Sequence, residues 1–112
     1  MLLEAFSVQR VKEIPEQSTA YPDRYNNLLL SPYIVYPPNA GLDEEASHYG
    51  KRIREVLVKA SGQPHNAYVN YAHGDESQEA LYGYEPWRLE KLRRLKKEYD
   101  PHDRFSYYAP IL

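Results

Sequence analysis

The sequence contains no cysteine, so disulfide bonds, thiolate catalysis and cysteine-ligated zinc are excluded for this chain. It also lacks any apolar run near the roughly 18 residues that a membrane-spanning helix requires, so no membrane partner is expected. Its 14 Lys and Arg residues are matched by 16 Asp and Glu residues, and the net charge of -2 provides no basic field for nucleic acid. Residues 1–4 lack the basic start and long apolar stretch of a signal peptide, which makes a cytoplasmic location the default expectation.

Glycine is scarce as well, with five residues, and neither a Gly-rich phosphate loop nor a G-x-S-x-G turn occurs. The four histidines are scattered, and none pairs at helical spacing with another ligand in a known zinc pattern. No metal site is therefore expected. These histidines are His48, His65, His73 and His102.

Tyrosine is the abundant residue, with twelve copies against two Phe and one Trp, and the chain also carries nine Pro. A buried Tyr needs a hydrogen-bond partner for its hydroxyl. So many tyrosines therefore indicate a wet pocket, an interface, or both.

Hydrophobic periodicity predicts five elements in one domain that spans residues 1–112. Residues 2–8, 28–36 and 65–71 have the composition of strands, with Pro32 favouring an edge or a bulge. Residues 42–60 and 86–99 have apolar residues at helical spacing. The expected fold class is α+β, a small antiparallel sheet of about three strands with two helices packed on one face. Because so small a sheet has exposed edges, it needs blunted edges or a partner.

The helix expected at 86–99 is rich in basic residues, including Arg88, Arg93 and Arg94. Acidic residues such as Glu90 and Glu98 interrupt them at distances that allow pairing within the helix. A solvated surface explains this pattern better than a phosphate-binding site does.

Residues 67–71 are the most informative stretch. On a strand, alternation places the phenol of Tyr68 and the amide of Asn70 on one face, and Val69 and Tyr71 on the other. From the residues alone, core packing with satisfied hydroxyls is the favoured interpretation, because strand tyrosines are common.

The distal context changes that balance. The C-terminal half of the chain contains a set of spaced motifs: Tyr68-Val69-Asn70-Tyr71, Leu81-Tyr82-Gly83, Trp87-Arg88-Leu89, Leu92, Leu95-Lys96, Tyr99-Asp100-Pro101 and Phe105. Taken together, these motifs resemble the C-terminal segment of the berberine bridge enzyme-like flavin oxidases, and of their fungal members in particular. Upstream, residues 14–16 and 19–24 are similar to the loop that precedes the next sheet strand in the same family.

The resemblance implies a division of labour. These oxidases bind FAD in a large N-terminal domain and use a substrate domain whose sheet covers the flavin ring. This chain matches the last part of the substrate domain, with a berberine-like tail at residues 66–111. By resemblance Tyr68 is the catalytic position, as a base or substrate contact. Asn70 and Tyr71 are the cofactor-binding positions, and Tyr71 also serves with Trp87 as an anchor.

Two departures from the family pattern bear on chemistry. Residues 7–10 replace the usual Gly-Gly pair, so the close backbone approach made there is not expected. Leu30 and Pro32, with Ser31 between them, occupy the strand positions where the family places a polar base or a flavin-side Gln. Neither Leu30 nor Pro32 can move a proton.

The resemblance therefore predicts a substrate-domain segment of an FAD-dependent oxidoreductase that is inactive alone and needs a flavin-domain partner. The complete enzyme would transfer hydride from a carbon of a small-molecule substrate, such as an alcohol, sugar or alkaloid, to flavin N5, with reoxidation by oxygen. One alternative is a stand-alone, non-enzymatic module derived from that family that self-associates or binds another protein. A third possibility is a small apolar ligand bound without a cofactor.

Overall fold

The structure is a computed structural model that describes all 112 residues. The chain forms two compact units, each built from two separate stretches of sequence. Unit 1 contains residues 1–6 and 28–65, and unit 2 contains residues 7–27 and 66–112. Whether the two units fold as one domain stays a prediction.

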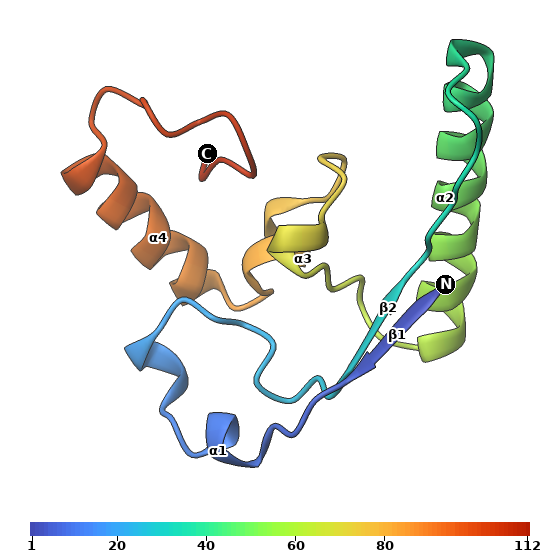
Figure 1. Cartoon of the computed structure of the whole chain (residues 1–112). Helices are drawn as coiled ribbons and strands as arrows, with labels where there is room; N and C mark the ends of the chain where they lie inside the picture. The colour runs from blue at the N-terminus through green and yellow to red at the C-terminus, as the bar shows by residue number, and fades with distance from the viewer. The chain divides into compact units, whose positions relative to one another are not determined.

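A two-stranded antiparallel sheet forms part of unit 1 (Figure 1). Strand β1, Leu2–Ala5, pairs with β2, Leu28–Ser31, so that Leu3 lies opposite Leu30. The α+β class is confirmed, but the sheet has two strands where about three were expected. Strand β2 ends at Ser31 because Pro32 has no N–H to continue the ladder.

Helix α2, Ala40–Ser61, confirms the long helix expected from the sequence. The side chain of Asn39 accepts a 3.0 Å hydrogen bond from the Gly41 amide at its start. Gly62 ends the helix in the left-handed conformation, with φ of 63°, which residues with a side chain rarely adopt. No α2 residue is buried.

The segment between β2 and α2 lies along the helix rather than extending the sheet (Figure 1). The Tyr36 hydroxyl donates a 2.8 Å hydrogen bond to the carboxylate of Asp43 in the first turn of α2. The same carboxylate raises the pKa of the Tyr36 hydroxyl. The side chain of Ile34 lies beside Gly50, in the middle of the helix. The strand expected to reach residue 36 therefore ends at Ser31, and the residues that follow it lie against α2.

Unit 2 contains α4, Pro86–Tyr99, which confirms the second expected helix. Pro86 occupies the first turn, where its missing N–H costs no helical hydrogen bond. Because α4 lies in the other unit, the expectation that both helices pack on one face of the sheet stays a prediction.

Three short helical segments and one turn occur where the sequence indicated loops or a strand. They are α1, Gln9–Lys12; the 3₁₀ helix η1, Glu16–Ser18; the 3₁₀ turn η2, Val69–Tyr71; and α3, Gln78–Tyr82. The strand expected at 65–71 is wrong, because residues 69–71 turn instead of extending. Helix α3 contacts α4, and Ala80, Leu81 and Leu89 are the only fully buried apolar residues.

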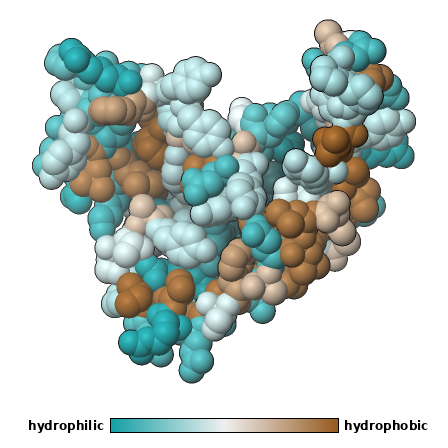
Figure 2. Space-filling model, in the orientation of Figure 1, coloured by the Kyte–Doolittle hydropathy of each residue, from teal (hydrophilic) through white to brown (hydrophobic).

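Large apolar and aromatic side chains are exposed in both units. Figure 2 shows brown, hydrophobic patches on the visible face. Unit 1 exposes Leu2, Leu3, Phe6, Leu28, Tyr33 and Val35, and unit 2 exposes Tyr25, Tyr99 and Phe105. No helix combines the length and apolar character needed to cross a bilayer. A core of three residues is small for a chain of this length, so much apolar area stays in contact with water.

Candidate functional site

The turn η2 carries Asn70 and Tyr71, and Tyr68 directly precedes it, so the three residues that the sequence assigned to the site lie together along the chain. The amide of Tyr71 donates to the carbonyl of Tyr68 at 2.9 Å, and the amide of Ala72 donates to the carbonyl of Val69 at 3.3 Å. These consecutive i→i+3 bonds curl the backbone just after Tyr68, whose own conformation is still extended. Tyr68 and Asn70, which were expected to share one face of a strand, therefore meet across a turn.

Tyr68, Asn70 and Tyr71 come together on this turn. The side-chain amide of Asn70 donates a 2.8 Å hydrogen bond to the Tyr68 hydroxyl oxygen. The rings of Tyr68 and Tyr71 meet edge to face, with centroids 5.3 Å apart and an angle of 77° between their planes. Tyr68 is half-buried, Asn70 is exposed, and Tyr71 is 53% exposed. The three side chains therefore form one partly exposed polar and aromatic group.

Tyr21 lies near this group and belongs to the same unit. Burial raises the pKa of the Tyr21 hydroxyl, and the neighbouring Asp23 and Tyr68 raise it further, whereas Arg24 lowers it. Burial also raises the pKa of Asp23, against a hydrogen bond from Asn26 and the charge of Arg88, which both lower it. The loop at residues 19–24, noted for its resemblance, thus supplies neighbours to Tyr68.

Two arginines are buried in unit 2, and sequence reasoning missed both. Arg88 is 1% exposed, so its expected place on a solvated helix surface is wrong. Its Nε lies 3.3 Å from Oε2 of Glu85, and Nη1 donates a 3.4 Å hydrogen bond to the Tyr21 carbonyl. Its guanidinium lies 4.5 Å from the ring centroid of Trp87. Arg88 therefore ties the start of α4 to the loop that carries Tyr21.

Arg24 is 3% exposed and has no carboxylate partner in the structure. Its Nη1 donates a 2.8 Å hydrogen bond to the Val11 carbonyl, its Nη2 donates to the Thr19 hydroxyl, and its Nε has no partner. These bonds hold the loop against α1. A charge run cannot reveal such burial, and the only sequence signal was the position of Arg24 within the family-like stretch 19–24.

Leu30 and Pro32 belong to unit 1, whereas Tyr68 belongs to unit 2. Leu30 pairs across the sheet with Leu3, and Ser31 ends β2. The side chains of Leu30 and Pro32 carry no group that can transfer a proton. Of positions 30, 32 and 68, only Tyr68 carries a group that can transfer a proton.

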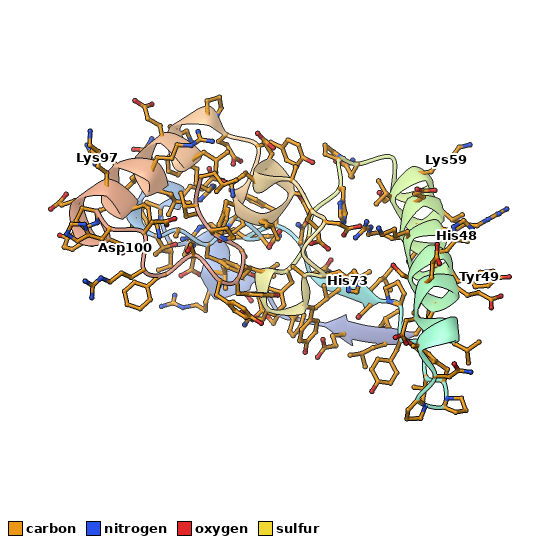
Figure 3. All side chains as sticks on the ribbon, turned by 90° about the horizontal axis from the view of Figure 1, so that it is seen from above. His48, Tyr49, Lys59, His73, Lys97 and Asp100 are labelled. Carbon is orange, nitrogen blue, oxygen red and sulfur yellow. The ribbon has the colours of Figure 1, made fainter.

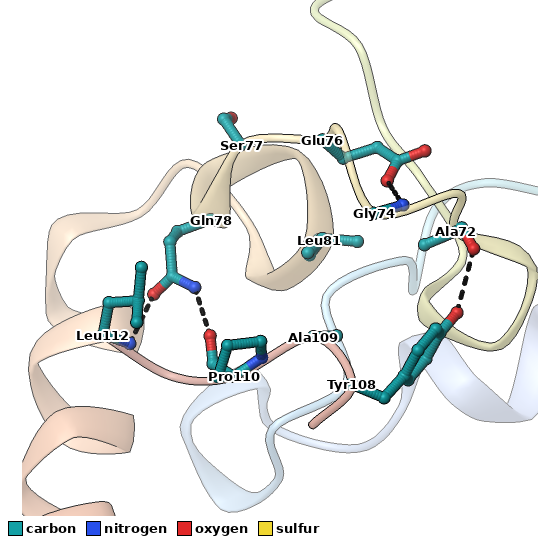
Figure 4. A pocket seen from close by; sticks show the side chains of 10 residues that line it. All are labelled: Ala72, Gly74, Glu76, Ser77, Gln78, Leu81, Tyr108, Ala109, Pro110 and Leu112. Carbon is teal, nitrogen blue, oxygen red and sulfur yellow. Dashed lines mark hydrogen bonds between the residues drawn. The ribbon is translucent and has the colours of Figure 1, made fainter. Parts of the chain in front are cut away.

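A pocket of about 350 Å³ lies between α3 and the last residues of the chain (Figure 4). Its polar groups are engaged with one another: the Glu76 carboxylate accepts from the amides of His73 and Gly74, and the Gln78 side chain bonds the chain end. Burial raises the pKa of Glu76, but these backbone hydrogen bonds leave it lowered overall. The pocket is lined by Ala72, Gly74, Glu76, Ser77, Gln78, Leu81, Tyr108, Ala109, Pro110 and Leu112.

The histidines occupy separate places. His48 lies on α2, where its ring meets that of Tyr49 at 5.9 Å, and His73 lies in the loop before α3 (Figure 3). The structure contains no group of three or more metal-ligating side chains.

The Tyr68 group suits contact with one part of a flavin. An amide and an exposed aromatic ring match the polar edge and the flat face of an isoalloxazine ring. The two buried arginines are already engaged with backbone and side-chain groups, so they do not form a phosphate site. The chemistry of these side chains is thus compatible with contact to a flavin ring, whereas the engaged arginines offer no site for a diphosphate.

Comparison with known proteins identifies relatives of this chain. Residues 67–111 match a family described as berberine and berberine like. The chain is 47% identical over its full length to an FAD-linked oxidoreductase of Penicillium roqueforti. Over 96% of its length it is 46% identical to one of Penicillium rubens and 42% identical to one of Gibberella zeae. No solved structure matches.

The chain spans 22% of the length of each of these three relatives. The matches confirm the resemblance to fungal FAD-linked oxidases that the motifs indicated. FAD is the cofactor named for the relatives.

Proposed function

Because residues 67–111 match the berberine and berberine like family, we propose that this chain is a substrate-domain segment of an FAD-dependent oxidoreductase. It works with a flavin-binding domain and is inactive without one. Tyr68 contacts the substrate as the proton-transfer group, and Asn70 and Tyr71 contact the flavin.

The hydrogen bond from Asn70 to Tyr68 is the observation that carries this proposal. Because the amide donates to the phenol oxygen, the proton of the Tyr68 hydroxyl stays available for a second partner. An alcohol substrate must lose its hydroxyl proton as its carbon gives up hydride, and Tyr68 would accept that proton only after releasing its own. FAD, when bound, supplies the two-electron acceptor for the carbon that is oxidised. The chain's own contribution is to orient the substrate and to hold or move its proton.

The exposed apolar side chains support the need for a flavin-domain partner. Only Ala80, Leu81 and Leu89 are fully buried among the apolar residues, while Leu2, Leu28 and many others face water. The chain also spans 22% of its relatives' length, so a complete oxidoreductase of this kind contains much more protein. Contact with that protein would cover part of the exposed apolar area.

A chimera tests the proposal directly. The matching segment of the Penicillium roqueforti oxidoreductase, which is 47% identical, is replaced by this chain. We expect the chimera to bind FAD and to oxidise the parent enzyme's substrate, whereas the isolated chain leaves the fluorescence of added FAD unchanged. In the chimera, Tyr68→Phe should lower kcat by about 100-fold or more with the flavin absorbance retained.

Tyr107→Phe is the matched control, since the Tyr107 side chain is fully exposed. It should leave kcat unchanged. An unchanged kcat in the Tyr68→Phe chimera would remove Tyr68 from proton transfer. A chimera that folds without FAD would contradict the assignment of the chain to a flavoenzyme.

A stand-alone module that self-associates or binds another protein is the second candidate. Leu30 and Pro32, which cannot move a proton, and the exposed apolar residues of β1 and β2 favour it. It predicts that the purified chain forms a defined oligomer by light scattering without flavin. A monomer that associates only with a flavin-binding domain would contradict it.

A further inference from the structure

The hydroxyl of Tyr108 lies on the turn that carries the Tyr68 group. It donates to the carbonyl of Val69 at 2.6 Å and lies 3.0 Å from the carbonyl of Ala72, so one O–H is shared between two acceptors. Figure 4 shows the bond to Ala72. These carbonyls flank Asn70 and Tyr71 along the backbone. A side chain 36 to 39 residues away in sequence therefore bonds the backbone on both sides of the two proposed flavin contacts.

The residues after Tyr108 are fastened to unit 2 by further hydrogen bonds. The Gln78 side chain donates to the Pro110 carbonyl at 2.5 Å and accepts from the Leu112 amide at 3.1 Å. The Tyr82 hydroxyl donates to the Ala109 carbonyl. Tyr108 is thus held from its C-terminal side by α3, and its hydroxyl is directed to η2 rather than left to rotate in solvent.

The turn itself is weakly held by its own backbone. Its second i→i+3 bond, from the Ala72 amide to the Val69 carbonyl, is long at 3.3 Å. A single 3₁₀ turn has poor hydrogen-bond geometry and few internal bonds, so external partners decide its conformation. Tyr108 is the side chain that bonds both Val69 and Ala72. Loss of its hydroxyl removes a constraint on the direction of the Tyr68 and Asn70 side chains.

We propose that Tyr108 is a positioning residue that holds Tyr68 and Asn70 in register through the carbonyls of Val69 and Ala72. This role requires no contact between Tyr108 and substrate or cofactor. The polar atoms that line the adjacent pocket also serve this positioning. They bond one another and fasten the chain end to α3, and are not directed at a ligand. The catalytic consequence rests on the proposed function, but the effect on the turn does not.

The first test uses the 112-residue chain and needs no cofactor. Tyr108→Phe is compared with Tyr107→Phe, which alters an exposed neighbour with the same chemistry. In ¹⁵N–¹H NMR spectra, we expect Tyr108→Phe to shift the side-chain amide signals of Asn70. It should also speed hydrogen exchange at the Ala72 amide about fivefold to tenfold, as expected for one lost hydrogen bond. Tyr107→Phe should do neither.

Gln78→Leu provides a second variant that keeps the Tyr108 hydroxyl but removes the fastening of residues 110 and 112. It should shift the Asn70 signals in the same direction as Tyr108→Phe. Unchanged Asn70 signals and unchanged Ala72 exchange in both folded variants would overturn the proposal.

The second test uses the chimera and separates positioning from general stability. Tyr108→Phe should lower kcat about tenfold to a hundredfold with KM nearly unchanged, the result expected when reacting groups are misplaced. An equal loss in the Tyr107→Phe chimera would overturn the proposal. If the chimera fails to bind FAD, the proposed function fails, and the NMR comparison still decides whether Tyr108 positions the turn.

Discussion

The side-chain amide of Asn70 donates a 2.8 Å hydrogen bond to the hydroxyl of Tyr68 across a single 3₁₀ turn. The two residues are separated by one position, and the turn brings their polar ends together while the Tyr71 ring packs against the Tyr68 ring. Because the bond lies near the surface, it contributes more to the orientation of Tyr68 than to the stability of the chain.

Asn70→Ala should therefore change the site while leaving the fold nearly intact. We expect the ring signals of Tyr68 to shift in NMR spectra, because its hydroxyl loses a donor. The free energy of unfolding, measured with urea, should fall by no more than about 1 kcal/mol, the usual net value of one hydrogen bond. Asn66→Ala, at an exposed position nearby, is the control and should leave the Tyr68 signals in place. A loss well above that value would make the bond a structural one.

Gly83 is predicted to tolerate no side chain. Its φ is 100°, and an added Cβ would lie 2.7 Å from Oε2 of Glu85 and 2.8 Å from Nε of Arg88. Gly83→Ala should therefore lower the free energy of unfolding by the backbone strain of about 1–3 kcal/mol plus a further clash of about 1–3 kcal/mol. Urea denaturation followed by circular dichroism measures both contributions together.

Gly74→Ala separates the two contributions, because Gly74 has nearly the same φ, 102°, with no atom near an added Cβ. It should show the backbone cost alone. Equal losses of unfolding free energy in the two variants would mean that the side chains of Glu85 and Arg88 move aside for the added methyl group. The absence of a side chain at Gly83 would then not be needed to keep Arg88 in its buried position.

The sequence predicted the elements whose pattern is long and regular. Helices α2 and α4 have apolar spacing over several turns and clear terminal residues such as Gly62 and Pro86, and both appear with bounds close to those expected. Residues 65–71 are too few for periodicity to distinguish a strand from a turn. Residues 69–71 form a turn that local composition did not predict. The hydroxyl of the distant Tyr108 donates hydrogen bonds to the carbonyls of Val69 and Ala72 at this turn.

That Tyr68, Asn70 and Tyr71 form the functional site stays a prediction, and their arrangement differs from the one expected. Tyr68, Asn70 and Tyr71 were selected together from a family resemblance, and the structure brings them into contact. The expected strand face is wrong, because contact arises from the turn. Arg88 could not be identified as buried from sequence, since its spacing from acidic neighbours is the same as that of a surface arginine.

Asp100, directly after α4 (Figure 3), should make stability depend on pH in the acid range. Its carboxylate accepts hydrogen bonds from Lys96 and from the amides of Phe105 and Arg104. Together these bonds lower the pKa of Asp100 from 3.8 to about 2, and the hydrogen bond from Lys96 is the largest cause. A carboxyl with a lowered folded-state pKa stabilises the fold above its unfolded value and loses that stabilisation as pH falls.

The stability that Asp100 provides should therefore be complete above about pH 4 and decline towards pH 2. Asp100→Asn should melt at a lower temperature than the parent chain at pH 7, and the difference should narrow between pH 4 and pH 2. Thermal melts across that range measure it. Glu98→Gln changes an exposed carboxylate two residues earlier on α4 and should show no such pH-dependent difference. A difference that stays constant with pH would exclude the charge of Asp100 as its cause.

Helix α2 should be the least protected long element of the isolated chain. It is 22 residues long and has no buried residue, whereas α4 buries Arg88 and Leu89. Because tertiary packing supplies most of the stability of a helix in a protein, backbone amides of α2 should exchange with solvent at least about tenfold faster than those of α4. Hydrogen exchange followed by NMR tests this.

Asn39→Ala should speed amide exchange in the first turn of α2 further, because the bond to Gly41 is lost. The expected factor is about five, which corresponds to roughly 1 kcal/mol. Equal protection of α2 and α4 in a monomer would contradict the prediction, and protection of α2 that rises with chain concentration would favour the self-associating module.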